Sequence, residues 1–277
     1  MNKVKRLLMT ILTSGIATIL SFLISFILTP YITNKLGVEA YGFVTLAKNF
    51  TQYATIITIA LNSYAARYIT VSYHKNNMKK SQEYISSVYY GDVTISAVIM
   101  IIAAGFILFL DKILNISLDL VFSVKLLFFF VFLSFVITTV GTSYTAAAYI
   151  KNRLDIVGVF RSLSYVIEVI FYIIVFSITT PEVWQVGVAI CIAQLVIFGG
   201  NYYIYKKYTP ELKIRRKSVS FNAIKKLVVN GIWNSINSLG NTLNSGLDLI
   251  VTNLWLSDLA MGQVAITKTI SSIFMSF

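Results

Sequence analysis

The chain has 277 residues, of which 57% are apolar and only 12% are charged, and its net charge is +12. Soluble domains carry roughly 25% charged residues, so this composition excludes an ordinary soluble domain and predicts a membrane protein. One cysteine and one histidine exclude an internal disulfide and a histidine-cluster metal site. On a membrane chain, the basic charge predicts a cytoplasmic face rather than nucleic-acid binding.

Long apolar segments follow one another along almost the whole chain. A spanning helix needs about 20 apolar residues, whereas barrel strands are about ten residues long and alternate strictly. Seven segments are long enough to span a membrane: 7–33, 41–72, 84–110, 120–150, 156–179, 184–205 and 223–255. An eighth apolar segment begins near residue 259. The predicted fold class is therefore all-α, a polytopic helical membrane protein with short loops.

Lysines and arginines gather in alternate loops. The N-terminus and the loops around 75–80, 151–153 and 206–226 together hold 16 of the 23 basic residues. By the positive-inside rule, we expect a multi-pass protein with a cytoplasmic N-terminus.

A short motif recurs at an offset of 220 residues. Segments 36–48 and 256–268 are identical at five of 13 positions, and both end in a lysine inside an apolar run. Because six spans precede the basic stretch, a second lobe would enter the membrane in the same sense as the first. We expect an N-terminal lobe over 1–205, a basic cytoplasmic linker over 206–222 and a truncated second lobe over 223–277. The natural protein would then have roughly 440 residues.

Segment 223–255 carries a polar stripe at helical spacing. Its members share one helix face: Asn230, Asn234, Asn237, Asn241, Asn244, Asp248 and Thr252. The repeat offset maps a weaker polar face onto segment 7–33, with Ser14 and Ser21 among its members. Segment 41–72 continues the theme: Thr45, Lys48, Gln52, Thr55 and Asn62. Interhelical hydrogen bonds and the wall of a water-filled cavity both explain such faces, and the number of polar groups favours the cavity.

Seven ionisable residues fall at membrane depth, where exposure to lipid would cost about 2.5–3.5 kcal/mol each. They are Lys48, Arg67, Asp92, Arg161, Glu168, Asp248 and Lys268. We expect Arg67 and Asp92 to form a structural pair, and Arg161 and Glu168 to share a helix face that serves either packing or ion coupling.

The two lysines Lys48 and Lys268 are repeat equivalents. They either extend toward the outer headgroups or form a symmetric pair that holds a phosphate-bearing substrate. Asp248 either pairs with Lys268 or carries a proton.

The motif Leu36-Gly37-Val38-Glu39-Ala40-Tyr41-Gly42, together with Gly246 to Val251 leading into Leu256 to Gly262, carries a family resemblance. The chain resembles the Wzx-type flippases of lipid-linked oligosaccharides, in the multidrug/oligosaccharidyl-lipid/polysaccharide exporter superfamily. Ser257 and Met261 depart from the glycine and the aromatic residue that are common in the second copy. The resemblance implies two six-helix lobes around a V-shaped cleft and a location in the bacterial cytoplasmic membrane.

The implied activity moves an undecaprenyl-diphosphate-linked oligosaccharide to the outer leaflet by alternating access, for cell-surface polysaccharide such as O-antigen or capsule. We assign substrate binding to Lys48, Lys268, Arg161, Gln52, Asn62, Ser14, Ser21, Asn234, Asn237 and Asn241. We assign ion coupling to Asp248, Glu168 and Asp92. No nucleotide-binding glycine loop is present, so H⁺ or Na⁺ is the expected coupling ion, with no cofactor and no metal. The lipid bilayer and other polysaccharide-assembly proteins are the expected partners.

Two alternatives remain. A drug or metabolite exporter of the same superfamily, working as a cation antiporter, would need acidic and aromatic walls, whereas the residues here are basic and amide-rich. A membrane enzyme is disfavoured because the spans contain no histidine and the loops are short.

Overall fold

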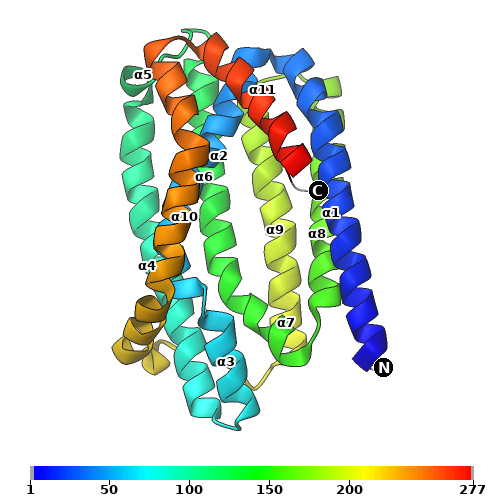
Figure 1. The fold of residues 1–277 in the computed structure, drawn as a ribbon, viewed down its shortest axis with the longest axis vertical. Coiled ribbons are helices and arrows are strands. Elements are labelled where there is room, and N and C mark those ends of the chain that lie inside the picture. The colour runs from blue at the N-terminus through cyan, green and yellow to red at the C-terminus, as the bar shows by residue number, and fades with distance from the viewer. Residues whose placement is uncertain (1–2, 276–277) are drawn as a thin grey trace.

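The computed structural model describes residues 3–275, with side chains over 8–271, and this part is all-α, which confirms the predicted fold class. The long helices are α1 (Lys3–Leu36), α2 (Val38–Asn62), α4 (Met78–Leu108), α6 (Val121–Thr142), α8 (Leu154–Ile178), α9 (Val183–Tyr208), α10 (Phe221–Trp255) and α11 (Asp258–Met275). The short ones are α3 (Ala65–His74), α5 (Leu110–Ile113), α7 (Ala146–Lys151) and the 3₁₀ turns η1 (Ser143–Thr145) and η2 (Arg216–Ser218). The long helices run side by side along the molecule (Figure 1).

Fewer helices meet the length and hydropathy of a membrane span than the sequence analysis expected. Within the described residues, five stretches qualify: Leu8–Leu36, Met78–Leu108, Val121–Lys151, Leu154–Ile178 and Val183–Tyr208. The helices α2 and α10 fall short because polar residues on one face lower their apolar content.

Helix boundaries differ from the predicted segments at three places. Segment 41–72 is broken at Ser63 and Tyr64, so that α2 and α3 are separate helices. Helix α9 extends to Tyr208, which shortens the basic stretch between the long helices to residues 209–220, where η2 lies. Gly37 alone separates α1 from α2, and its φ of 93° with ψ of 162° belongs to a region that is essentially restricted to glycine.

Helix α2 lies at the centre of the bundle and contacts α6, α10 and α11 (Figure 1). Its apolar face is buried in a core that includes Phe43 and Leu46 of α2 with Leu127 and Phe128 of α6, all fully buried. Helices α6 and α9 pack along each other, and α1 packs along α8. Six long helices, α1, α4, α6, α9, α10 and α11, contact α2.

Helix α10 packs on α2 through small residues. A Cβ atom on Gly231 would lie 2.0 Å from the carbonyl oxygen of Ala60, so the two backbones are in direct contact. One turn further, Ser235 Oγ donates a hydrogen bond to the carbonyl oxygen of Ile56 at 2.8 Å. Close approach at small residues is a common way for helices to associate in membranes, where lipid provides no hydrophobic driving force between them.

The two copies of the repeated motif contact each other where α2 and α11 cross. A Cβ atom on Gly42 would lie 2.8 Å from the Cα of Gly262, and one on Gly262 would lie 2.3 Å from the carbonyl oxygen of Val38. Nearby, the Tyr41 hydroxyl lies 3.0 Å from Thr269 Oγ1 and 3.2 Å from Thr29 Oγ1. The glycines that match in the sequence repeat are thus the ones that allow this crossing.

A second contact joins the same two parts of the chain. Asn115, between α5 and α6, donates its backbone N–H to Asn253 Oδ1 at 3.0 Å and its amide to the Asn253 carbonyl oxygen at 2.7 Å. Asn253 donates its own amide to the Asn115 carbonyl oxygen at 3.0 Å. Because Asn253 is fully buried, these bonds fix the end of α10 against the rest of the bundle.

Replacement of glycine by alanine should affect stability differently at the helix crossing and at an open position of α10. Gly262→Ala should destabilise the protein by about 1–3 kcal/mol, because the added methyl has no space. Gly240→Ala, at an α10 position where nothing lies within 4 Å of an added Cβ, should leave stability unchanged or raise it. Thermal unfolding of both variants in detergent tests this, and a Gly262→Ala melting temperature at or above that of Gly240→Ala would contradict it.

Candidate functional site

A cavity of about 560 Å³ runs along the polar face of α2, between α2, α6 and α9. Helix α2 supplies half of its polar residues: Lys48, Thr51, Gln52, Thr55, Thr58 and Asn62. At about 100° per residue these positions fall within one third of the helix circumference, so one face of a single helix presents all of them. The polar face that the sequence identified on segment 41–72 therefore lines a cavity that is open on one side.

The opposite wall is also polar. It consists of Ser134, Thr138, Thr139 and Thr142 of α6 and Gln194 of α9. Thr138 Oγ1 donates to Gln194 Oε1 at 3.1 Å and lies 2.8 Å from the Ser134 carbonyl oxygen, which ties the two helices together. The hydroxyls are held by their own helix but keep lone pairs for a ligand or water.

The sequence analysis did not identify this second wall. Ser134, Thr138 and Thr142 are spaced by four residues, a helical stripe that was visible in the sequence. Nothing in the sequence indicates which neighbour such a stripe faces, and segment 120–150 is otherwise strongly apolar.

A second cavity of about 310 Å³ adjoins the first at Lys48, which lines both. Its walls come from α1, α2, α8, α9 and α11, and include Ser21, Glu168 and Tyr172. The Tyr172 hydroxyl donates to Glu168 Oε1 at 3.1 Å. The side chain of Lys48 is exposed, and no carboxylate of the described residues forms an ion pair with it. A cationic group without a fixed counterion therefore stands where the two cavities meet.

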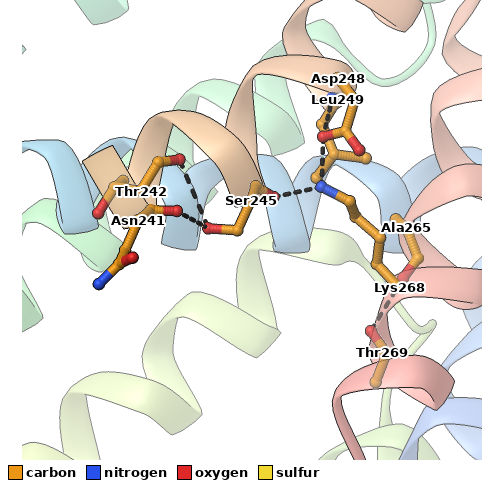
Figure 2. A network of polar contacts seen from close by, with 8 residues as sticks. All are labelled: Asn241, Thr242, Ser245, Asp248, Leu249, Ala265, Lys268 and Thr269. Carbon is orange, nitrogen blue, oxygen red and sulfur yellow. Dashed lines mark hydrogen bonds and ion pairs between the residues drawn. The ribbon is translucent and has the colours of Figure 1, made fainter. Parts of the chain in front are cut away.

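The repeat-equivalent lysine has a different environment. Lys268 reaches from α11 to α10, where its ammonium contacts the Asp248 carboxylate and the carbonyl oxygen of Ser245 (Figure 2). The sequence left two roles open for Asp248, an ion pair with Lys268 or the carrying of a proton. In the structure Asp248 forms the ion pair. Lys48 and Lys268 thus share a position in the repeat but not a partner.

Asp92 is completely buried in α4, and its partners are neutral. Asn62 Nδ2 donates to Asp92 Oδ1 at 2.7 Å, and Ser143 Oγ donates to Oδ2 at 3.3 Å. The expected pair with Arg67 was wrong: Arg67 is exposed, and it is not among the ion pairs of the described residues. Because Asn62 also lines the first cavity, it connects that cavity to the buried carboxyl group.

The asparagine stripe of α10 lies on the surface of the described chain. Asn234, Asn237 and Asn241 are exposed and line neither cavity. The packing face of α10 includes Gly231, Ser235, Thr242 and Gly246, about 100° around the helix from the stripe. The asparagine stripe therefore lies outside the face of α10 that packs on α2.

The remaining assigned residues are not part of these cavities. Ser14 on α1 and Arg161 on α8 are both exposed and line neither one. Of the residues assigned to substrate binding, the structure thus brings Lys48, Gln52 and Asn62 together in one cavity and Ser21 into the adjoining one.

Comparisons with known proteins agree with this architecture. The chain is 32% identical over 249 residues to an uncharacterized membrane protein of Bacillus subtilis (strain 168), EpsK, covering 90% of this chain and 49% of the relative. The chain thus spans about half the length of the curated relative it matches. A solved structure, the inward-facing conformation of a multidrug resistance MATE family transporter of the MOP superfamily, superposes with a TM-score of 0.69 at 14% identity. That match covers 94% of this chain and 59% of the transporter, and it shows a shared fold.

A family description for "Polysaccharide biosynthesis protein" matches residues 7–276, nearly the whole chain. The chain therefore belongs to the polysaccharide biosynthesis protein family and has the fold of a MOP-superfamily transporter, in agreement with the sequence resemblance.

Proposed function

We propose that the protein containing this chain flips a lipid-linked oligosaccharide from the cytoplasmic to the outer leaflet by alternating access. The observation that carries the proposal is the cavity along α2, whose polar wall consists of hydroxyl and amide groups around one unpaired lysine. Family membership supports a role in polysaccharide biosynthesis, and the shared fold supports transport. The polar groups of the cavity are suited to a sugar-bearing substrate, which is consistent with both.

The lining groups suit a sugar. Threonine hydroxyls and the Gln52, Asn62 and Gln194 amides both donate and accept, as sugar hydroxyls do. The volume of about 560 Å³ is within the usual range of about 300–1,000 Å³ for ligand sites. A lysine at the edge of such a wall would hold the diphosphate of the substrate as a point charge.

A complete transporter would have two lobes, and we propose residues 1–205 as the first. In this arrangement the second lobe starts with α10 and faces the first across a cleft, and the exposed asparagine stripe of α10 contributes to the wall of that cleft. Alternating access would then be a rocking of the lobes around α2, α10 and α11. The basic loops at one end of the molecule, around 75–80 and 209–220, favour a cytoplasmic location for that end and for the N-terminus in a bacterial membrane (Figure 1).

The alternative, a cation-antiporting exporter of cationic drugs or metabolites, has less support from the cavity. A cationic drug would need acidic groups in the wall, and the larger cavity has Lys48 and no carboxylate. Glu168 lines only the smaller cavity, next to that lysine.

Replacement of Lys48 tests the proposal. Lys48→Ala should lower flipping of a fluorescent undecaprenyl-diphosphate oligosaccharide in proteoliposomes by about 10–100-fold, because a hydrogen bond to a charged group contributes about 1.5–3 kcal/mol. Lys48→Arg keeps the cation and should retain most of the activity.

The matched control is Lys35→Ala, an exposed lysine at the end of α1 that lines neither cavity, and it should flip at the unmodified rate. Uptake of cationic dyes by the same vesicles provides the comparison with the alternative. Normal flipping by Lys48→Ala, or dye uptake without oligosaccharide flipping, would overturn the proposal.

Ion coupling can be assigned by comparing two carboxylates. We propose Asp92 as the coupling residue, because it is buried and reaches the cavity through Asn62, whereas Asp248 already pairs with Lys268. Asp92→Asn should abolish the stimulation of flipping by a proton or Na⁺ gradient and leave gradient-free flipping in place. Glu168→Gln is the control and should remain stimulated. Equal stimulation of unmodified protein and Asp92→Asn would exclude the role.

A further inference from the structure

A second site lies away from the cavities along α2, between α4, α9, η1 and the basic loop 209–220. Four tyrosines and two basic residues line a space of about 450 Å³: Tyr89, Tyr90, Tyr144, Tyr205, Lys213 and Arg215. The rings of Tyr144 and Tyr205 are 5.0 Å apart, and those of Tyr89 and Tyr144 are 5.9 Å apart. The aromatic side of this space is therefore a packed wall.

The backbone of the basic loop is fixed against the helices. The Tyr205 hydroxyl donates to the Leu212 carbonyl oxygen and accepts from the Ile214 N–H at 3.3 Å. The Arg215 N–H donates to Ser86 Oγ of α4 at 3.1 Å. These bonds hold Lys213 and Arg215 at the mouth of the tyrosine-lined space.

The charges of these two side chains are not neutralised within the described chain. Both side chains are exposed, and neither is among the ion pairs of the described residues. Two cations beside one tyrosine-lined space form a set of donors for an anionic group with several oxygen atoms, such as a phosphate.

An apolar groove lies next to this space. It has a volume of about 370 Å³, lies between α2, α4 and α10, and is lined by Ile57, Leu61, Ile95 and Val228 among others. Tyr90 lines both the tyrosine-lined space and the groove, so the two are adjacent. A free inorganic ion would not occupy the apolar groove. An amphiphile would place its polar headgroup in the tyrosine-lined space and its apolar chain in the groove.

We propose that this pair of spaces binds a lipid with a phosphate headgroup, with the phosphate at Lys213 and Arg215 and an acyl or polyprenyl chain in the groove between α4 and α10. Basic pockets between spanning helices on the cytoplasmic side are suited to anionic headgroups. The hydrocarbon chain of the lipid would contact both α10 and the helices that precede α10 in the sequence. A bound lipid would therefore stabilise the packing of α10. The proposal does not depend on the transported substrate.

Two lipids share the required chemistry, an anionic phospholipid and a polyprenyl phosphate. The experiment uses the full-length protein in detergent, titrated separately with phosphatidylglycerol, undecaprenyl phosphate and inorganic phosphate, with bound species counted by native mass spectrometry. The lipid that binds more tightly identifies the source of the headgroup.

Two variants separate the headgroup space from the groove. Lys213→Ala with Arg215→Ala should weaken binding of the preferred lipid by at least about 30-fold, because two charge-assisted contacts are lost. Its control, Lys79→Ala with Lys80→Ala, removes the same charge from exposed positions outside both spaces and should change binding by no more than about threefold.

In the groove, Thr94→Trp should fill the space for the chain and weaken lipid binding. Its control is Val98→Trp, an exposed position one turn further along α4 that does not line the groove. Equal lipid binding by both charge variants, or by both tryptophan variants, would overturn the proposal. Binding of inorganic phosphate alone, without either lipid, would also overturn it.

Discussion

Direct backbone contact between α2 and the two last helices is the constraint on which the rest of this structure depends. Gly42 and Gly262 permit the crossing of α2 and α11, and Gly231 permits α10 to lie against Ala60. Lipid tails are as apolar as leucine, so helices in a membrane gain most from close packing of this kind. With α10 and α11 on one side and the apolar core on another, the rotation of α2 about its axis is fixed.

Fixing α2 in this way also fixes its polar face. Residues from Lys48 to Asn62 that could not face lipid without a large cost meet Thr138 and Gln194 across a space about the size of a ligand site. The buried Asp92 is part of the same arrangement, because Asn62 contacts both the cavity and the carboxylate. Packing, solvation of the polar face and the candidate binding site are thus consequences of one helix position.

The repeat does not make the two lysines equivalent in chemistry. Lys268 is held by Asp248, whereas the residue that precedes Lys48 by the same 20 positions is Leu28, which offers no charge. An ion pair between α10 and α11 stabilises their junction, and an unpaired lysine on α2 remains available to an anion. The first half of the repeat therefore carries the stronger candidate for substrate contact.

The sequence by itself determined the all-α class, the positions of the long helices and the polar face of α2, because apolar length and helical spacing are local properties of the chain. It also left open the pairing of Asp248 with Lys268, which the structure resolves. Only the tertiary structure decided that Asp92 contacts Asn62 and Ser143 rather than Arg67, and that Thr138 and Gln194 face α2. Spacing along a helix defines a face, but the neighbour of that face depends on how distant helices pack around it.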